Sequence, residues 1–200
     1  MASGYLGFEE AVSILDRGGV LLLPTDTLPG LHCRADRQAG VERVAGLKGR
    51  DDGKPLLVLA GSWEQTQGGV CAPLTALQER ICRACWPGPF SLILPAGTLL
   101  ARRVTAGGAT VAVRVPRHPQ LQRLILAAGF PLVSTSANLQ GQPPCTGLEE
   151  AMALFGPGVD GCWQPARGPA AGTRPSALVD LGGPVPRVLR PGPLPLPDQS

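Results

Sequence analysis

The stretch Pro131-Leu-Val-Ser-Thr-Ser-Ala-Asn138 joins a short apolar run to a cluster of polar side chains. The apolar run follows a break at Gly129, which predicts a buried strand that leads into three hydroxyl groups and an amide. In open α/β sheets ligands bind beyond the carboxyl ends of the strands, so these side chains are expected to point into a site. Ser134, Ser136 and Asn138 alternate and would share one face of an extended segment. A turn that caps the next helix is the alternative interpretation.

Predicted helices and strands alternate along the rest of the chain. Helical periodicity and the glycines and prolines that bound it predict helices at residues 8–17, 36–47, 73–85, 119–128 and 148–155. Further apolar runs predict strands at residues 20–23, 56–60, 90–94, 110–115, 176–181 and 187–190, and a short strand near 160–164 within a long connection at 156–175. Consecutive strands near 90–115 and at the end of the chain predict an α/β class with a mixed sheet.

Length, charge and cysteine content restrict the class of protein. The 200 residues, 44% of them hydrophobic, suffice for one domain with a sizeable core. A net charge of +3 with scattered Lys and Arg predicts affinity for an anionic ligand but no dedicated nucleic-acid arm. The beginning of the chain lacks the pattern of a signal peptide and no stretch reaches membrane-spanning length, which predicts a cytoplasmic protein. The domain is expected to span residues 5–192, with a flexible Pro-rich tail at 193–200.

The six cysteines are expected to be reduced, small core residues. Cys82 and Cys85 form a C-x-x-C pair on a predicted helix, but a structural zinc site needs a second closely spaced pair of ligands. The sequence therefore predicts no metal site.

Cations and hydroxyl groups recur near the ends of the predicted strands. Lys48, Arg50 and Lys54 cluster after a predicted helix, where a solvated helix end is the alternative interpretation. Arg114 lies inside an apolar run, which is costly unless its charge finds a partner or a ligand. Such a set suits a site that orients and neutralises a polyanion, as phosphoryl transfer requires.

Other catalytic patterns are absent from the sequence. Neither G-x-x-x-x-G-K-[ST] nor G-x-G-x-x-G after a strand occurs, and G-x-S-x-G is missing. A hydrolase triad would need one of the two histidines to meet a serine through folding. His32 is instead predicted to be a satisfied strand residue, and His118 to cap a helix.

A series of short motifs covers nearly the whole chain. They are Pro24-Thr-Asp-Thr-Leu-Pro-Gly-Leu31, Lys48-Gly-Arg50, Lys54-Pro-Leu56, Trp86-Pro-Gly-Pro89, Val111-Ala-Val-Arg-Val-Pro116 with His118-Pro119, Ser134-Thr-Ser-Ala-Asn138, Pro175-Ser176 with Val179-Asp180, and Leu189-Arg-Pro-Gly192. Together and in this order they closely resemble the YrdC-domain family of threonylcarbamoyl-adenylate synthases. The resemblance implies a single α/β domain with a twisted sheet around a basic cavity.

The resemblance also implies a reaction and a set of site residues. L-threonine, bicarbonate or CO₂ and ATP, the last with Mg²⁺, would give threonylcarbamoyl-AMP and pyrophosphate for the N6-threonylcarbamoyladenosine modification of tRNA. Residues implied to contact ATP are Arg50, Lys54, Thr110, Ser136, Asn138 and Arg190, and those implied in catalysis are Lys48, Arg50, Ser136 and Asn138. Residues implied to hold threonine or its carbamate are Thr27, Arg114, Ser134 and Ser176. A separate threonylcarbamoyl-transferase complex would receive the product.

Two positions depart from the family's pattern, and two other functions remain open. Pro29 stands where the family usually has an aromatic residue, and Leu59 where some members have a histidine. The chain resembles the short form of the family, without the additional C-terminal domain of the long form. A YciO-type accessory protein that binds RNA or nucleotide, with weak or altered activity, is the alternative. A carbamoyl-transferring module like that of hydrogenase maturation proteins is a third possibility, although it normally belongs to a much longer chain.

Overall fold

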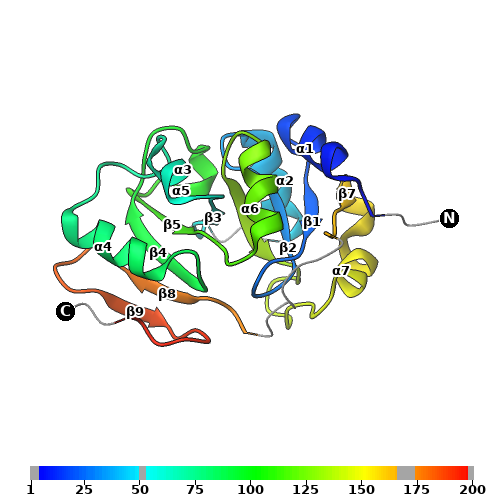
Figure 1. Ribbon diagram of the computed structural model, residues 1–200. Helices are drawn as coiled ribbons and strands as arrows, with labels where there is room; N and C mark the ends of the chain where they lie inside the picture. The colour runs from blue at the N-terminus through cyan, green and yellow to red at the C-terminus, as the bar shows by residue number, and fades with distance from the viewer. Residues whose placement is uncertain (1–4, 50–52, 166–173, 198–200) are drawn as a thin grey trace.

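The computed structural model describes residues 5–49, 53–165 and 174–197 and contains helices and strands that alternate along much of the chain (Figure 1). The helices are α1 (Phe8–Asp16), α2 (Gln38–Leu47), α3 (Trp63–Gln67), α4 (Ala76–Cys85), α5 (Arg102–Thr105), α6 (Pro119–Ala127), α7 (Leu148–Phe155) and the 3₁₀ turn η1 (Gly156–Gly158). The strands are β1 (Leu21–Leu23), β2 (Gly30–Arg34), β3 (Leu57–Leu59), β4 (Phe90–Pro95), β5 (Thr110–Arg114), β6 (Leu132–Ser136), β7 (Gly161–Cys162), β8 (Ala177–Asp180) and β9 (Arg187–Arg190).

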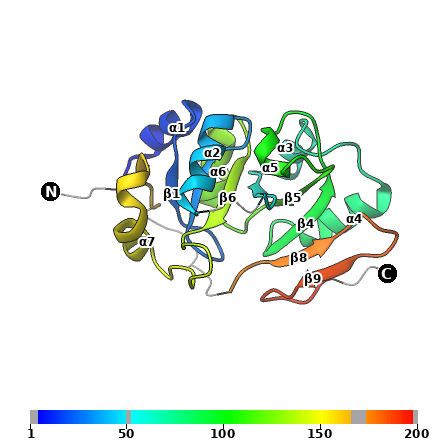
Figure 2. The ribbon, with the colours of Figure 1, turned by 180° about the vertical axis from the view of Figure 1, so that it is seen from behind.

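The described strands form one mixed sheet in the order β7-β1-β2-β6-β3-β5-β4-β8-β9. Strand β6 runs antiparallel to both of its neighbours, β2 and β3, whereas β3 pairs with β5 in parallel. Helix α1 and strand β7 lie at one end of the molecule and β8 and β9 at the other, seen from the front and from behind (Figures 1 and 2). The predicted single α/β domain with a mixed sheet flanked by helices is therefore confirmed.

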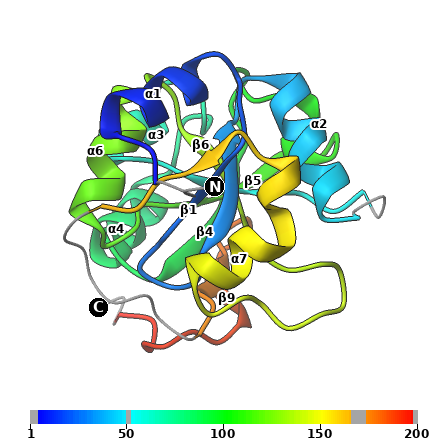
Figure 3. The ribbon, with the colours of Figure 1, turned by 90° about the vertical axis from the view of Figure 1, so that its right-hand side faces the viewer.

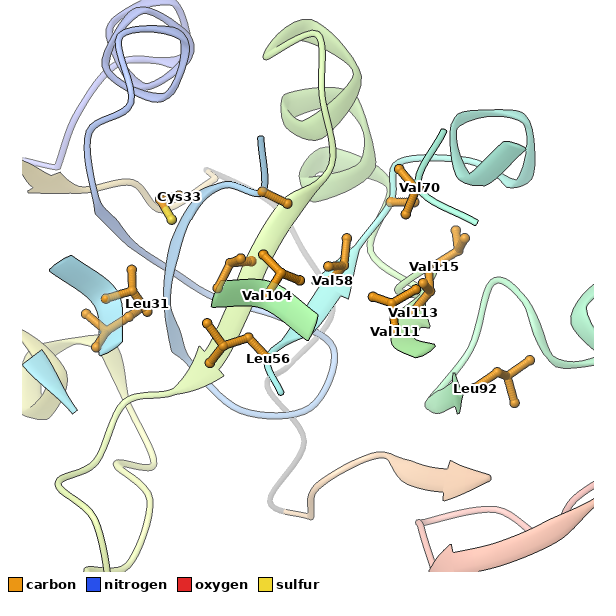
Figure 4. Close-up of a cluster of buried hydrophobic side chains, with 14 of the residues drawn as sticks. Leu31, Cys33, Leu56, Val58, Val70, Leu92, Val104, Val111, Val113 and Val115 are labelled. Atoms are coloured by element: carbon orange, nitrogen blue, oxygen red, sulfur yellow. The ribbon is translucent and has the colours of Figure 1, made fainter. Parts of the chain in front are cut away.

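One face of the sheet is covered by the larger core cluster. Val58, Val113 and Val133 point to this side from the three central strands, and Leu31 joins them from β2. Figure 4 shows part of this cluster, including Val58 near Val104 of α5, and Val113 beside Val111 and Val115. Buried residues of α2, α4 and α7 belong to the same cluster.

The opposite face of the sheet is covered only in part. Helices α1 and α6 pack there against Leu21, Leu59 and Leu132, on the side of the strands that faces away from α2 and α7 (Figure 3). This smaller cluster contains side chains of β1, β6 and β3, and the strands beyond β3 in the sheet, namely β5, β4, β8 and β9, contribute none of its described residues. The uncovered part of this face is where the polar side chains gather.

Three elements and two local details differ from the sequence-based expectations. Strand β2 and the short helices α3 and α5 were not predicted, because β2 is only five residues long and follows a polar loop without a clear alternation. Helix α4 begins after its N-cap Thr75, so Pro73 lies outside the helix and not at an early helical position. In the segment predicted to be a flexible tail, Leu196 packs partly against the larger cluster, and residues 198–200 lie outside the described part.

Candidate functional site

A cavity of about 540 Å³ opens on the partly covered face of the sheet. Leu57, Ala112 and Ser134 are cross-strand neighbours on β3, β5 and β6, and all three line it. Most residues that the resemblance implies for the site also line it: Thr27, Lys54, Thr110, Arg114, Ser134, Ser136, Ser176 and Arg190. Residues from six separate segments of the chain therefore meet in one place.

The position of the cavity corrects one step of the sequence-based reasoning. The polar residues were expected at the carboxyl ends of strands in an open sheet, but β6 is antiparallel to both neighbours, so strand ends of one direction do not share an edge. The cavity lies instead over the face of the sheet, where alternate residues of each strand point. The alternation of Ser134 and Ser136 holds, and both line the cavity, whereas Asn138 lies beyond the end of β6 and does not.

Arg114 is the most deeply buried cation of the cavity wall, with 2% of its surface exposed. Its Nη1 donates a hydrogen bond to Thr27 Oγ1 at 2.9 Å, and its Nη2 lies 3.3 Å from Asp26 Oδ1. Burial lowers the pKa of the guanidinium, the Asp26 carboxylate opposes this and nearby Arg190 adds to it. Asp26 is therefore the partner that the charge in an apolar strand requires.

The ion pair between Arg114 and Asp26 leaves hydrogen-bonding capacity unused. The 3.3 Å contact does not have the geometry of a hydrogen bond, and within the described residues both Asp26 Oδ1 and Arg114 Nε lack a hydrogen-bond partner. Asp26 Oδ2 accepts from the backbone N–H of Arg117 at 2.9 Å, which fixes the carboxylate. A buried guanidinium that keeps an unused donor is suited to bind one further acceptor, such as a carboxylate oxygen of a ligand.

Lys48 and Asn138 stabilise the cavity wall at the end of β6 without lining the cavity themselves. Lys48 is 3% exposed, and its Nζ donates to the carbonyl oxygen of Ser136 at 2.8 Å and to Asn138 Oδ1 at 2.6 Å, as well as to the carbonyl oxygen of Asn138. Ser136 Oγ donates to the same Asn138 Oδ1 at 2.6 Å. Asn138 Nδ2 in turn donates to the carbonyl oxygens of Leu139 and Gln142. This network holds the end of β6, although neither Lys48 nor Asn138 lines the cavity.

In the folded chain His32 lies next to Ser134, a contact that the sequence could not show. His32 of β2 is directly opposite Ser134 of β6, and its Nε2 lies 3.0 Å from Ser134 Oγ. Its Nδ1 lies 2.9 Å from the carbonyl oxygen of Gly30, so His32 is the satisfied strand residue that was predicted. Burial, together with the charge of Arg114, lowers the pKa of His32 to about 3. So weak a base does not activate a serine, and no carboxylate among the described residues contacts the ring.

His118 confirms the prediction of a helix cap. It is the N-cap of α6, and its Nδ1 accepts a hydrogen bond from the backbone N–H of Leu121 at 3.2 Å. His118 is buried, which lowers its pKa.

One residue of the cavity wall, Ser91, was not anticipated from the sequence, whereas the strand-end hydroxyls of Thr25 and Thr27 were. Ser91 of β4 forms a 2.8 Å hydrogen bond with Ser176, whose carbonyl oxygen accepts from Arg190 Nε at 3.2 Å. Thr25 lines the wall beside Thr27, at 3.0 Å between the hydroxyl oxygens. A single hydroxyl within the apolar run of β4 was the signal for Ser91. Arg50, implied to be catalytic and to contact ATP, lies outside the described residues.

The described residues offer little to a resident metal ion. Within residues 5–49, 53–165 and 174–197, no three His, Cys, Asp or Glu side chains lie close enough to hold one. All six cysteines are buried, as predicted, and burial raises the pKa of each thiol, to about 12 for Cys33 and to about 11 for Cys85. In the described part of the chain, no helix is both long and apolar enough to cross a membrane.

Comparison with known proteins places the chain in a family. The family model named for Sua5, YciO and YrdC, described as telomere recombination, matches residues 13–192. The chain belongs to the Sua5/YciO/YrdC family. Among the curated relatives of this family member, a threonylcarbamoyl-AMP synthase of Klebsiella pneumoniae subsp. pneumoniae is 40% identical over 155 residues, which are 76% of this chain and 82% of the relative. The corresponding enzyme of Shigella flexneri is 38% identical over 147 residues, 73% of this chain and 77% of the relative.

Solved structures of the Sua5/YciO/YrdC family share the fold. P. abyssi Sua5 complexed with L-threonine is 28% identical with a TM-score of 0.85, and the match covers 96% of this chain and 57% of the Sua5 chain. This family member thus spans a little more than half of that protein. E. coli YciO is 26% identical with a TM-score of 0.82, and the match covers 93% of this chain and 89% of YciO.

Proposed function

We propose that this chain is an L-threonylcarbamoyladenylate synthase, an enzyme that makes threonylcarbamoyl-AMP and pyrophosphate from L-threonine, bicarbonate or CO₂, and ATP. The observation that carries the proposal is the cavity, which gathers Lys54, Arg114, Arg190 and several hydroxyl groups over one face of the sheet. Its volume of about 540 Å³ falls in the range typical of small-molecule sites. The family membership and the names of the curated relatives support the same reaction.

The cavity divides into two ends in this proposal. L-threonine binds at Thr27, Arg114, Ser134 and Ser176, with its carboxylate toward the unused donor of Arg114. The nucleotide binds toward Lys54, Thr110, Ser136 and Arg190, where exposed cations can reach its phosphates. Arg50 contacts the phosphates as the family motif implies. Lys48 and Asn138 act through the end of β6, because their contacts fix Ser136 and they do not line the cavity.

The protein contributes alignment and charge neutralisation to the proposed reaction. The amine of threonine takes up CO₂ to form a carbamate, and a carbamate oxygen then attacks the α-phosphorus of ATP while pyrophosphate leaves. The threonine carbamate and ATP are both anionic, so cations that hold them together lower the free-energy cost of their approach. Mg²⁺ enters with ATP as part of the substrate, because the cavity lining carries no carboxylate among the described residues that could hold the ion by itself.

The product is expected to leave for a second enzyme. A threonylcarbamoyl group on AMP is a reactive mixed anhydride, which suits its transfer to the N6 position of an adenosine in tRNA by a separate transferase complex in the cytoplasm. Direct contact between this chain and RNA would be an additional property, and the proposed reaction does not require it.

The proposal is tested by incubating the purified protein with MgATP, bicarbonate and L-threonine and measuring pyrophosphate and the adenylate. Pyrophosphate release should depend on all three substrates, and L-serine should support it less well than L-threonine. Absent or threonine-independent release would overturn the proposal and favour an accessory role like the one considered for YciO-type proteins, which have the same fold.

A further inference from the structure

The hydrogen bonds around His32 determine which way the hydroxyl group of Ser134 points. The carbonyl oxygen of Gly30 can only accept, so His32 Nδ1, 2.9 Å away, must carry the proton. In a neutral imidazole the other nitrogen, Nε2, then has only a lone pair. Ser134 Oγ lies 3.0 Å from Nε2, so the serine is the donor of this hydrogen bond. Its hydroxyl hydrogen is directed at His32 and away from the cavity that Ser134 lines.

The neutral state of His32 is secured by its surroundings. The side chain of His32 is fully buried, and the charged group that perturbs its pKa among the described residues, Arg114, is a cation. Both effects oppose a proton on Nε2 and lower the pKa of His32 from 6.5 to about 3, so the acidity constant of its imidazolium form is roughly three orders of magnitude higher than usual. The direction of the Ser134 hydrogen bond is therefore the same throughout the neutral pH range.

The geometry points to His32 as a positioning residue that makes Ser134 a hydrogen-bond acceptor toward the cavity. Ser134 then receives a donor group of the bound amino acid, its α-amino or β-hydroxyl group, and disfavours a carboxylate or phosphate oxygen. This inference rests on the proposed function, because it concerns the amino-acid end of that site. It fixes the orientation of the substrate, since the carboxylate must face the donors of Arg114 instead.

The donors of Arg114 lie on the other side of the amino-acid end. Arg114 Nη1 donates to Thr27 Oγ1 at 2.9 Å, and Arg114 Nε has no hydrogen-bond partner within the described residues. Ser134 thus offers only lone pairs to a ligand, while Arg114 offers N–H groups. The amino-acid end of the cavity therefore has one accepting side and one donating side.

The tautomer of His32 can be measured in the unmodified protein. The chain has two histidines, and their contacts predict opposite tautomers: His32 carries its proton on Nδ1, whereas His118 Nδ1 accepts from Leu121 and so leaves the proton on Nε2. Imidazole ¹⁵N NMR of the full chain should show one ring of each type, with His32 unchanged between pH 5 and pH 8. A proton on Nε2 of His32 would overturn the inference, because the hydroxyl hydrogen of Ser134 would then be available to the ligand. This measurement does not depend on the proposed function.

A matched pair of variants tests the consequence for binding. His32→Leu removes the acceptor, whereas His32→Gln keeps an oxygen near the position of Nε2. By calorimetry, His32→Leu should weaken L-threonine binding by about fivefold, the effect of one hydrogen bond, and His32→Gln should bind nearly as well as the wild type. Neither substitution should change the affinity for a non-hydrolysable ATP analogue. In a Ser134→Ala background, His32→Leu should have no further effect on threonine binding.

The outcomes separate this inference from the proposed function. A wild-type protein that binds no L-threonine would contradict the proposed function. Normal threonine binding by His32→Leu, or an equal loss in the Ser134→Ala background, would contradict the role of His32 alone. Two analogues identify the donor: 2-aminobutyrate lacks the hydroxyl group of threonine, and 3-hydroxybutyrate lacks its amino group. If one analogue binds wild type and His32→Leu with the same affinity, that analogue lacks the group that donates to Ser134. If His32→Leu weakens binding of both analogues by the same factor, the inference is overturned.

Discussion

Arg114 combines deep burial with an incompletely used guanidinium. Its charge is balanced by Asp26 at 3.3 Å, and its Nη1 is taken up by Thr27, but Nε has no hydrogen-bond partner within the described residues. Leaving a buried donor unsatisfied is costly, so a residue of this kind is held in place by the fold for a partner that arrives later. Because Arg114 lines the cavity, we propose a substrate carboxylate as this partner.

Replacing Arg114 should affect the two substrates unequally. Arg114→Ala should raise the KM for L-threonine at least tenfold and change the KM for ATP much less, because a charged hydrogen-bond partner of one substrate is lost. Arg117→Ala serves as a control, since the side chain of Arg117 is exposed, donates to the carbonyl oxygen of Pro87 and lies outside the cavity. Steady-state kinetics in both substrates measures the difference. An equal loss for threonine and ATP would show that the proposed division of the cavity is wrong.

Lys48 and Lys54 belong to the same sequence cluster but have different surroundings. Lys48 is buried and donates to oxygens of Ser136 and Asn138, whereas Lys54 is exposed on the cavity wall. Lys48→Met should therefore lower the free energy of unfolding by about 1–3 kcal/mol, and Lys54→Met by less than about 0.5 kcal/mol. Lys54→Met should instead weaken binding of the ATP analogue. Urea unfolding and calorimetry on the two variants check this, and similar stability losses would contradict the assignment.

Helix α4 shows how a local element fixes part of the sheet. Thr75 and Gln78 form a capping box, in which Thr75 Oγ1 accepts from the backbone N–H of Gln78 and the Gln78 side chain accepts from the backbone N–H of Thr75. The Gln78 amide also donates to the carbonyl oxygen of Leu181 at 2.9 Å, just beyond β8. The cap therefore connects the start of the helix to the strand that follows Ser176 of the cavity.

The capping box should contribute measurably to stability. Thr75→Ala removes the accepting oxygen and should lower the free energy of unfolding by about 1 kcal/mol, whereas Thr75→Ser keeps it and should change stability by less than about 0.5 kcal/mol. Urea unfolding followed by circular dichroism gives both values. Equal stabilities of the Ala and Ser variants would mean that the first turn of α4 is held by packing alone.

At the scale of the whole molecule, incomplete coverage of one sheet face creates the cavity. Helices α1 and α6 bury side chains of β1, β6 and β3 on that face, whereas no helix of the smaller cluster covers Ser91, Ala112 and Leu178 of the strands beyond β3, and these residues line the cavity. The free-energy cost of leaving part of this face uncovered is offset by the apolar burial in the larger core cluster on the opposite face.

The two buried histidines make the stability of the fold depend on pH. Stability should fall below neutral pH because of these histidines. The pKa of His32 is lowered from 6.5 to about 3 and that of His118 is also lowered, so the unfolded chain binds more protons than the folded one as the pH falls below 6.5. The contribution of His32 is fully present above pH 6.5 and is lost toward pH 3, and that of His118 falls in the same direction. Between pH 7.5 and pH 5, His32 alone should account for about 2 kcal/mol of the loss. Urea midpoints across this range test it, and His32→Gln should show a shallower dependence; identical slopes would contradict the burial of a neutral His32.

The sequence by itself determined most elements and the residues of the site. Helix α7 and strand β9 have the predicted bounds, because periodicity and turn residues act over short distances. The motifs around Thr27, Arg114 and Ser134 likewise identified residues that the cavity gathers. Strand β2 escaped prediction because its alternation is obscured by burial on both faces.

Only the tertiary structure decided which polar groups meet. The antiparallel pairing of β6 moved the site from the edge of the sheet to its face and placed His32 opposite Ser134, more than a hundred positions away in the chain. Folding also brought Lys48 to Ser136 and Asn138, where it stabilises the end of β6 without lining the cavity. Asp26 became the partner of Arg114 through the approach of a loop to β5. Such contacts depend on strand order and register, which are set by the burial of whole faces and leave no local pattern in the sequence.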